Sequence, residues 1–268
     1  MRMRIIHDYG VVYDPWDWIT TRQPPPMMQD SRYHAKLAFR ARGHEDLVRR
    51  VGGIFAEIDE RLRRQEVVCV LELGCGYGTT LLELRKRYGP QVRLQGINRR
   101  QRDGDPDAFL RNGIERGLIA PDAPLTDPLP AIAYVDIADG LPFGDQSFDL
   151  VYSQVAWLYF ANKVAVIREV SRVLRDDGLA KIDADELCAE LPAEYQRLVE
   201  IWHDGRLVPF GDYLRRFGMA FEPAPEGEYL RFGKSPRFGA DLRLVFQLDL
   251  GELNQQWNGT KCVYRLTP

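Results

Sequence analysis

The residues best placed to do chemistry in this chain are an acid and three glycines that follow one apolar run. Residues 67–73 read VVCVLEL, and Glu72 is followed by glycines at positions 74, 76 and 78. Alternate glycines after a buried strand let the backbone turn sharply and let a ligand approach the main chain without meeting a Cβ atom. A carboxylate beside such a loop disfavours a phosphate group and suits a positively charged ligand. The spacing therefore predicts a binding loop for a cationic small molecule.

A dinucleotide-binding loop is the alternative for this segment. That loop follows the pattern G-x-G-x-x-G/A and leaves helix N–H groups free to receive pyrophosphate. Here position 79 is Thr79, and Glu72 adds negative charge where a phosphate would have to lie. A dinucleotide-dependent oxidoreductase is thus disfavoured, and retention of NAD by the protein would be the observation that supports it.

The order of Glu72, Gly74, Gly76 and Gly78 resembles the first motif of class I S-adenosylmethionine (SAM) dependent methyltransferases. Three later segments resemble further landmarks of that family in the same order: QVRLQGIN at 91–98, AIAYVDIADGLPFGDQSFDLVYSQ at 131–154 and REVSRVLRDDGLAKID at 168–183. Together they cover roughly residues 67 to 184. The resemblance implies SAM as cofactor and S-adenosylhomocysteine as product. The ammonium and sulfonium groups of SAM are positive, as the acid requires.

The elements that must position these residues alternate along the chain. Apolar runs at 67–73, 92–97, 131–135, 148–153 and 178–183 alternate with helical patterns near 79–88, 106–117 and 161–176. An amphipathic helix is predicted from His44 to Gln65. This alternation indicates βαβ crossovers and an α/β fold with a mainly parallel sheet covered on both faces. The resemblance implies a doubly wound seven-stranded sheet with an antiparallel last strand, for which residues 261–266 are the candidate.

Two regions outside the alternating pattern are predicted to elaborate the domain. Residues 1–43 form an aromatic N-terminal arm around Pro24–Pro26, and the remaining residues 44–268 form the methyltransferase-like domain. Aromatic side chains are costly to leave in water, so the arm is expected to pack as a lid. A C-terminal cap elaboration is expected at about 185–240, with helices near 192–203 and 211–217. Further strand-like runs follow at 228–233, 242–250 and 261–266.

Cofactor contacts are assigned from the resemblance, residue by residue. Asn98 stands where relatives usually carry an acid that accepts both ribose hydroxyls, and an amide can accept one such bond and donate another. Asp136 corresponds to the acid at the adenine amino group, with Asp139 as a competing candidate. Ile137 would pack on the ring, and Gln154 lies where the chain faces the transferable methyl group. The cofactor-binding set is Glu72, Gly74, Cys75, Gly76, Gly78, Asn98, Arg99, Asp136, Ile137 and Gln154.

Substrate and catalytic residues are less well marked, because methyl transfer from SAM mainly requires two reactants to be held in line. His203 is the candidate general base, and a structural role is its alternative. Asp183, Asp185 and Glu186 follow the fifth strand and would orient a substrate or form a solvated acidic turn. Aromatic residues are assigned to the substrate: Tyr9, Tyr13, Trp16, Trp18 and Tyr159.

Composition narrows the class of function. The 268 residues carry 36 Lys and Arg against 39 Asp and Glu, so the net charge of −3 provides no broad basic field for nucleic acid. The four cysteines show no metal-ligand spacing, and a reduced cytoplasmic location is expected. No apolar run is long enough to span a membrane. The predicted function is methyl transfer from SAM to a small molecule through an unresolved O, N or C atom. The alternative is a non-catalytic SAM-binding scaffold or regulatory protein; the oligomeric state is open.

Overall fold

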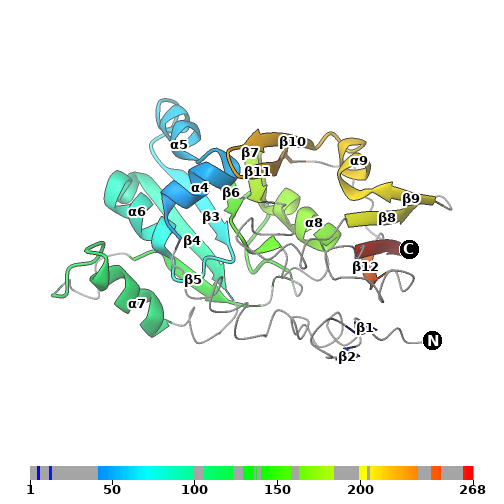
Figure 1. Ribbon diagram of the computed structural model, residues 1–268. Helices are drawn as coiled ribbons and strands as arrows, with labels where there is room; N and C mark the ends of the chain where they lie inside the picture. Colours follow the sequence, from blue (N-terminus) through cyan, green and yellow to red (C-terminus); the bar gives the residue numbers. More distant parts are fainter. Residues whose placement is uncertain are drawn as a thin grey trace.

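A seven-stranded sheet with the order β10-β11-β7-β6-β3-β4-β5 lies at the centre of the computed structural model (Figure 1). The structure describes residues 5–6, 12–13, 42–98, 106–122, 129–135, 137, 140–157, 163–183, 199–203, 206–234, 243–248 and 262–267. The parallel strands are β3 (Val68–Leu73), β4 (Val92–Asn98), β5 (Ala131–Tyr134), β6 (Phe148–Ser153) and β7 (Leu174–Asp183). Each overlaps one of the predicted apolar runs, so these strand predictions are confirmed. β7 begins at Leu174, before the run at 178–183 and within the stretch near 161–176 that was expected to be helical.

The last two strands of this sheet form a hairpin at its edge. β11 (Gly227–Gly233) is antiparallel to β7, and β10 (Ala220–Ala224) is antiparallel to β11. β10 therefore runs in the same direction as the parallel strands, and β11 is the reversed one. The prediction of a seven-stranded sheet with an antiparallel final strand is confirmed. Leu230 and Phe232 on β11 are buried, which explains why this strand adds to the sheet.

The prediction that residues 261–266 supply the antiparallel strand is wrong. β13 (Cys262–Thr267) pairs with β12 (Arg243–Leu248) and with β8 (Val199–His203), which in turn pairs with β9 (Arg206–Pro209) in a separate four-stranded sheet. β8 also replaces the end of the helix expected at 192–203. Because β10 and β11 belong to the central sheet, the cap predicted over 185–240 does not extend through residues 220–233. A two-stranded ladder joins β1 (Ile5–Ile6) to β2 (Val12–Tyr13).

Apart from the helix expected near 192–203, the predicted helices after residue 70 agree closely with the structure. They are α6 (Thr79–Tyr88), the short 3₁₀ turn η1 (Gly89–Gln91), α7 (Pro106–Glu115), α8 (Lys163–Val173) and α9 (Phe210–Arg215). The single helix expected from His44 to Gln65 is instead two helices, α4 (His44–Val51) and α5 (Phe55–Leu62). Gly52 and Gly53 lie between the two helices and have φ of 72° and 74°, a conformation that ends a helix. The break lets α4 contact β7, β10 and β11 while α5 contacts β3.

The order of the strands makes the sheet doubly wound. From β3 the chain moves through α6 to β4 and then through α7 to β5, whereas the step from β6 through α8 to β7 goes the opposite way along the sheet. Crossovers between parallel strands are right-handed, so α6 and α7 lie on one face and α8 lies on the other. The direction of winding changes between β3 and β6. Open α/β sheets bind their ligands at the carboxyl ends of strands at such a switch point.

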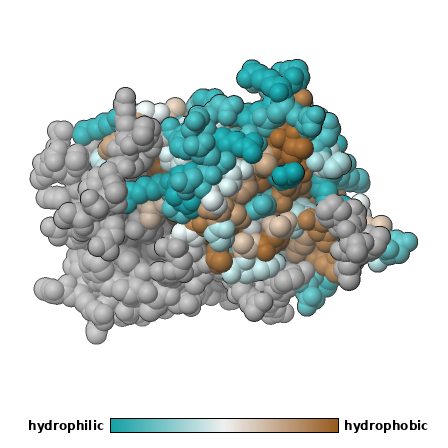
Figure 2. Space-filling model, turned by 180° about the vertical axis from the view of Figure 1, so that it is seen from behind, coloured by the Kyte–Doolittle hydropathy of each residue, from teal (hydrophilic) through white to brown (hydrophobic). Residues whose placement is uncertain are grey.

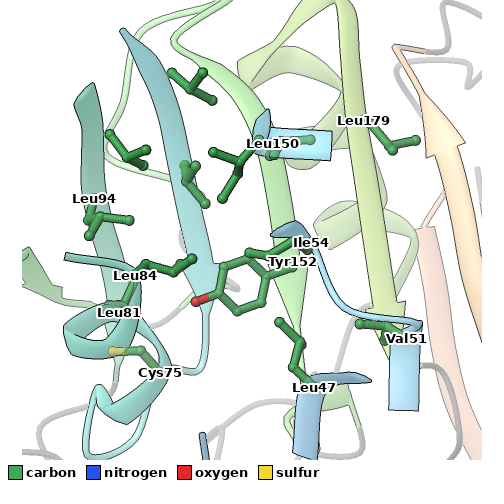
Figure 3. Packing of buried hydrophobic residues seen from close by; sticks show 14 of the residues in the cluster. Leu47, Val51, Ile54, Cys75, Leu81, Leu84, Leu94, Leu150, Tyr152 and Leu179 are labelled. Carbon is green, nitrogen blue, oxygen red and sulfur yellow. The ribbon is translucent and has the colours of Figure 1, made fainter. Parts of the chain in front are cut away.

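The main apolar core fills the face of the sheet under α4, α5 and α6. It joins Leu47 of α4 and Leu84 of α6 to Leu150 and Tyr152 of β6, all of them buried. Figure 3 shows the ring of Tyr152 extending from β6 toward β3, with its hydroxyl leading. A smaller cluster of Leu82, Phe109 and Ile119 packs α6 against α7. These contacts fix α6, and with it the loop that precedes α6.

The surface seen from behind carries mostly hydrophilic residues along its upper edge, with more hydrophobic residues toward the middle of the face (Figure 2). Among the described side chains, Val48 on α4 is the large hydrophobic residue that is exposed to solvent, with 40% of its surface accessible. Within the described ranges, no helix combines the length and apolar character needed to cross a membrane.

Candidate functional site

The predicted binding loop lies at the switch point, between the end of β3 and the start of α6. Gly74, Gly76 and Gly78 have φ of 70°, 49° and 64°, so the loop uses the left-handed conformation that glycine adopts without cost. The N–H groups of Gly74 and Cys75 both donate to the carbonyl oxygen of Ile97 on β4, at 2.9 and 3.0 Å. The loop is therefore held by the neighbouring strand.

The three glycines serve different purposes. A Cβ atom on Gly74 would overlap the side chain of Ala156, and one on Gly78 would overlap the ring of Phe109. A Cβ atom on Gly76 would meet nothing within 4 Å among the described residues. Gly74 and Gly78 thus permit close packing, and Gly76 is the position at which a ligand can approach the main chain.

Glu72 is buried beside this loop, with 2% of its surface exposed. Tyr152 donates its hydroxyl to Oε2 of Glu72 at 3.0 Å, and Gln154 donates Nε2 to Oε1 at 3.3 Å. Burial raises the pKa of Glu72 to about 8, against the opposing effect of the hydrogen bonds from Gln154 and Tyr152, and Glu83 raises it further. A positive charge placed next to this carboxyl would favour its ionised form. The site is thus suited to a cationic ligand.

Gln154, which directly follows β6, links Glu72 of β3 to Thr80 of α6. Besides the bond to Glu72, its Nε2 donates to Oγ1 of Thr80 at 2.8 Å. Its Oε1 is buried and has no hydrogen-bond partner among the described atoms. An unpaired buried acceptor is costly, and a ligand with an N–H or O–H donor would satisfy it. The amide therefore has capacity left for a ligand.

Asn98 and Asn112 hold the loop from the side of β4 and α7. Nδ2 of Asn98 lies 3.5 Å from the carbonyl oxygen of Gly76, which is a long hydrogen bond. Nδ2 of Asn112 donates to the carbonyl oxygen of Tyr77 at 3.0 Å and to Oγ1 of Thr79 at 2.8 Å. Asn112 was missed by the sequence reasoning. Its one signal was a polar residue on the apolar side of a helix, between Phe109 and Gly113.

The chain entering α4 also contacts the site, which the sequence did not indicate. Oγ1 of Thr80 donates to the carbonyl oxygen of Arg42 at 3.4 Å, and Glu83 accepts the backbone N–H of His44 at 2.5 Å. Thr80 and Glu83 belong to α6, the helix that follows the glycine loop. The chain that precedes α4 therefore reaches the central domain beside Gln154.

The other predicted residues divide into three groups. Cys75 and Ile137 are buried, and burial together with Glu72 raises the pKa of the Cys75 thiol well above its usual value, so it remains protonated. His203 lies in β8, a strand of the four-stranded sheet, and Tyr13 ends β2. The remaining predictions lie outside the described residues: Tyr9, Trp16, Trp18, Arg99, Asp136, Asp139, Tyr159, Asp185 and Glu186.

A comparison with protein families matches the middle of the chain, which includes β5, β6 and most of β7. A family model described as a methyltransferase domain matches residues 114–182, from α7 to the end of β7. The glycine loop lies outside this match, so its assignment depends on the motif and on the geometry above.

Two curated relatives and one solved structure indicate the range of similarity. The chain is 31% identical over 109 residues to a sarcosine/dimethylglycine N-methyltransferase of Halorhodospira halochloris, which is 41% of this chain and 34% of that protein. It is 29% identical over 143 residues to a ubiquinone/menaquinone biosynthesis C-methyltransferase of Xanthomonas oryzae pv. oryzae, 52% of this chain and 50% of that one. A solved SAM-dependent methyltransferase from Aquifex aeolicus aligns with 75% of this chain and 98% of its own at 15% identity, with a TM-score of 0.43. The chain thus spans a third to a half of the length of the two curated relatives.

Proposed function

We propose that this chain, a member of the class I SAM-dependent methyltransferases, transfers a methyl group from SAM to a small-molecule acceptor. The observation that carries the proposal is the pairing of a buried carboxyl, Glu72, with the open approach at Gly76, both at the switch point of the sheet. The acceptor atom is left open, since the relatives named above include an N- and a C-methyltransferase.

The described residues fit the methionine part of SAM. Glu72 supplies an acceptor whose ionised form is favoured by a neighbouring ammonium group. The Oε1 atom of Gln154 offers a second acceptor in the same buried region. Gly76 leaves room for the ligand against the backbone, and Asn98, next to it at the end of β4, is proposed to bind the ribose hydroxyls.

Further contacts belong to the proposal. Ile137 is buried just after β5, where it would pack against the adenine ring, and Asp136 beside it would accept the adenine amino group. Arg99 follows Asn98 directly and is proposed to lie along the same side of the cofactor. His203 stays a proposed base for an acceptor that must lose a proton.

Bound SAM supplies a methyl carbon already activated by its sulfonium, and in-line displacement by the acceptor leaves S-adenosylhomocysteine. The protein then has to hold and orient the two reactants and to exclude water from them. Glu72, Gln154 and the loop at Gly76 hold one reactant in place. The acceptor side is proposed to be completed by the N-terminal arm, residues 1–43, because the chain meets the central domain at Arg42 and His44, beside Thr80 and Glu83.

The cofactor site is tested by calorimetric titration of the protein with S-adenosylhomocysteine. Wild-type protein should bind it, and Gly76→Val should abolish binding because the branched side chain fills the ligand's space. Gly89→Val is the matched control: Gly89 also has positive φ, at 56°, and a Cβ atom there also meets nothing within 4 Å of the described residues, but it lies at the far end of α6. Equal affinity in the two variants would refute the site.

The arm is tested separately by deleting residues 1–20. Turnover with the true acceptor, followed as S-adenosylhomocysteine release, should be lost while affinity for S-adenosylhomocysteine falls much less. Circular dichroism of the truncated protein checks that the fold is retained. Full turnover after truncation would show that the arm does not cover the acceptor.

A further inference from the structure

Val155, just after β6, has a backbone conformation that such a residue rarely adopts. Its φ is +55°, in the left-handed region, where a β-branched side chain is strained. Strain of this kind persists only where the surroundings hold it, and it is common at functional sites. The backbone N–H of Val155 donates to Oδ2 of Asp183 at 3.0 Å. The carboxylate of Asp183 is thus in contact with the strained residue.

Asp183 is itself held from several elements. It is the last residue of β7, and its side chain is 3% exposed. Arg50 of α4, with 5% of its side chain exposed, lies 3.2 Å from the same Oδ2 atom. The other guanidinium nitrogen of Arg50 lies 3.4 Å from Glu226 in the β10–β11 turn, and the N–H of Glu226 donates to the carbonyl oxygen of Arg49 at 3.0 Å. The acceptor for Val155 is therefore fixed by β7, by α4 and by the edge hairpin.

The two neighbours of Val155 both touch the proposed cofactor site. Gln154 donates to Glu72, and Ala156 lies where a Cβ atom on Gly74 would overlap it. The torsion angles of Val155 set the direction in which the chain continues from Gln154 to Ala156. A change to an ordinary φ would move one of these residues away from the binding loop.

We propose that Asp183, held by Arg50, is a positioning residue for the cofactor. It keeps Val155 in the left-handed conformation and so keeps Gln154 against Glu72 and Ala156 against Gly74. The inference rests on the proposed function, because the positioned residues are those assigned to SAM. A role limited to stability, in which the Asp183–Arg50 pair only fastens α4 to β7, predicts something different. In that case the conformational freedom of residue 155 would not matter for binding.

A double-mutant cycle between Asp183→Ala and Val155→Gly separates the two roles, with the dissociation constant of S-adenosylhomocysteine as readout. In the Val155 background, Asp183→Ala should weaken binding about tenfold or more, since the strained conformation of Val155 is no longer held. Glycine adopts positive φ freely, so in the Val155→Gly background the same substitution should weaken binding less than about threefold. Asp183→Asn should retain most of the affinity, because an amide oxygen still accepts the N–H of Val155.

Asp149→Ala is the matched control. Asp149 is also a buried acid that accepts a backbone N–H, that of Cys69 at 2.7 Å, and pairs with an arginine, Arg175 at 2.8 Å. It lies near the amino ends of β3 and β6, away from the binding loop. This variant should unfold at a lower temperature and bind S-adenosylhomocysteine as the wild type does.

The outcomes distinguish the inference from the proposed function. Wild-type protein that does not bind S-adenosylhomocysteine refutes both. Wild-type binding with equal losses in the Val155 and Val155→Gly backgrounds, or with an equal loss in Asp149→Ala, refutes the positioning role alone. If Asp183→Ala does not fold, the cycle is run with Asp183→Ala/Arg50→Met, which removes both charges of the buried pair and avoids an isolated cation.

Discussion

Replacing Glu72 with glutamine should stabilise the ligand-free protein above neutral pH while weakening its affinity for SAM. Burial raises the pKa of this carboxyl to about 8, so its ionised form is disfavoured in the folded protein. Glutamine has nearly the same shape and carries no charge at any pH. It therefore removes the cost of ionisation and also removes the charge that a cationic ligand would pair with.

The sign and size of the stability effect follow from the two pKa values. The folded-state pKa is raised above the ordinary value of 4.5, so the stabilisation is complete below about pH 4.5 and is lost as pH rises toward 8. At 1.36 kcal/mol for each pKa unit, the free energy of unfolding of the wild type should fall by roughly 3 to 4 kcal/mol between pH 5 and pH 8 from this group alone. Glu72→Gln should lack this loss.

Urea unfolding at pH 5, 6.5 and 8 measures the effect, with wild type and variant compared at each pH. The difference in unfolding free energy should grow with pH in favour of the variant. Glu115→Gln, an exposed position on α7, is the control for the chemical change itself. Calorimetry at pH 8 should show weaker binding of S-adenosylhomocysteine to Glu72→Gln, by about tenfold or more if a charge-assisted bond is lost. A difference in unfolding free energy between wild type and Glu72→Gln that stays constant from pH 5 to pH 8 would contradict the reasoning.

Three further predictions concern Asn98, Gly78 and Tyr152 of the same site. Asn98→Asp should leave SAM affinity equal or improved, because the hydrogen bond that Asn98 donates to the loop is long and a carboxylate binds hydroxyl groups more strongly than an amide does. Asn98→Leu should weaken SAM affinity by about 1 to 3 kcal/mol. Calorimetry measures the affinity of both variants. Gly78→Ala should lower the free energy of unfolding by about 2 to 5 kcal/mol through positive φ and overlap with Phe109. Gly52→Ala, at a glycine that is also left-handed and whose Cβ would have its nearest neighbours at 3.9 Å, should cost only the backbone share, about 1 to 2 kcal/mol, by urea unfolding. Tyr152→Phe should destabilise the protein more at pH 8 than at pH 5, by about 1 to 2 kcal/mol, because its hydroxyl donates to a carboxylate; equal losses at both pH values would count against this.

The sequence predicted where helices and strands lie better than it predicted which strands pair with one another. Apolar runs and helical periodicity placed the parallel strands and α6 closely, because these patterns reflect burial of one face or of both. The pattern from His44 to Gln65 continues through Gly52 and Gly53, and only the positive φ of both glycines shows that the helix ends there. Residues 261–266 do form a strand, but its pairing with β8 and β12 depends on tertiary contacts that a local pattern does not contain.

The candidate site shows the same division. The glycine loop, Glu72 and Asn98 were identified because their spacing follows one strand and the next, and the structure brings them together. Thr80, Asn112 and Tyr152 were not identified. Each of them acts through a side chain that reaches a residue distant in the sequence, such as the contact of Tyr152 with Glu72 across neighbouring strands. A single sequence carries no signal for such pairs beyond a polar residue in an apolar segment.

Two buried acids at the carboxyl ends of parallel strands differ in their partners, and the difference indicates which of them is available to a ligand. Asp183 at the end of β7 is paired with Arg50, so its charge is already compensated inside the protein. Glu72 near the end of β3 accepts hydrogen bonds from Tyr152 and Gln154, which are neutral, and burial keeps its pKa high. A ligand cation gains most where a buried carboxyl has no cation yet among its described donors. The ammonium group of SAM should therefore lie on the side of Glu72, and Asp183 should act on the cofactor only through Val155.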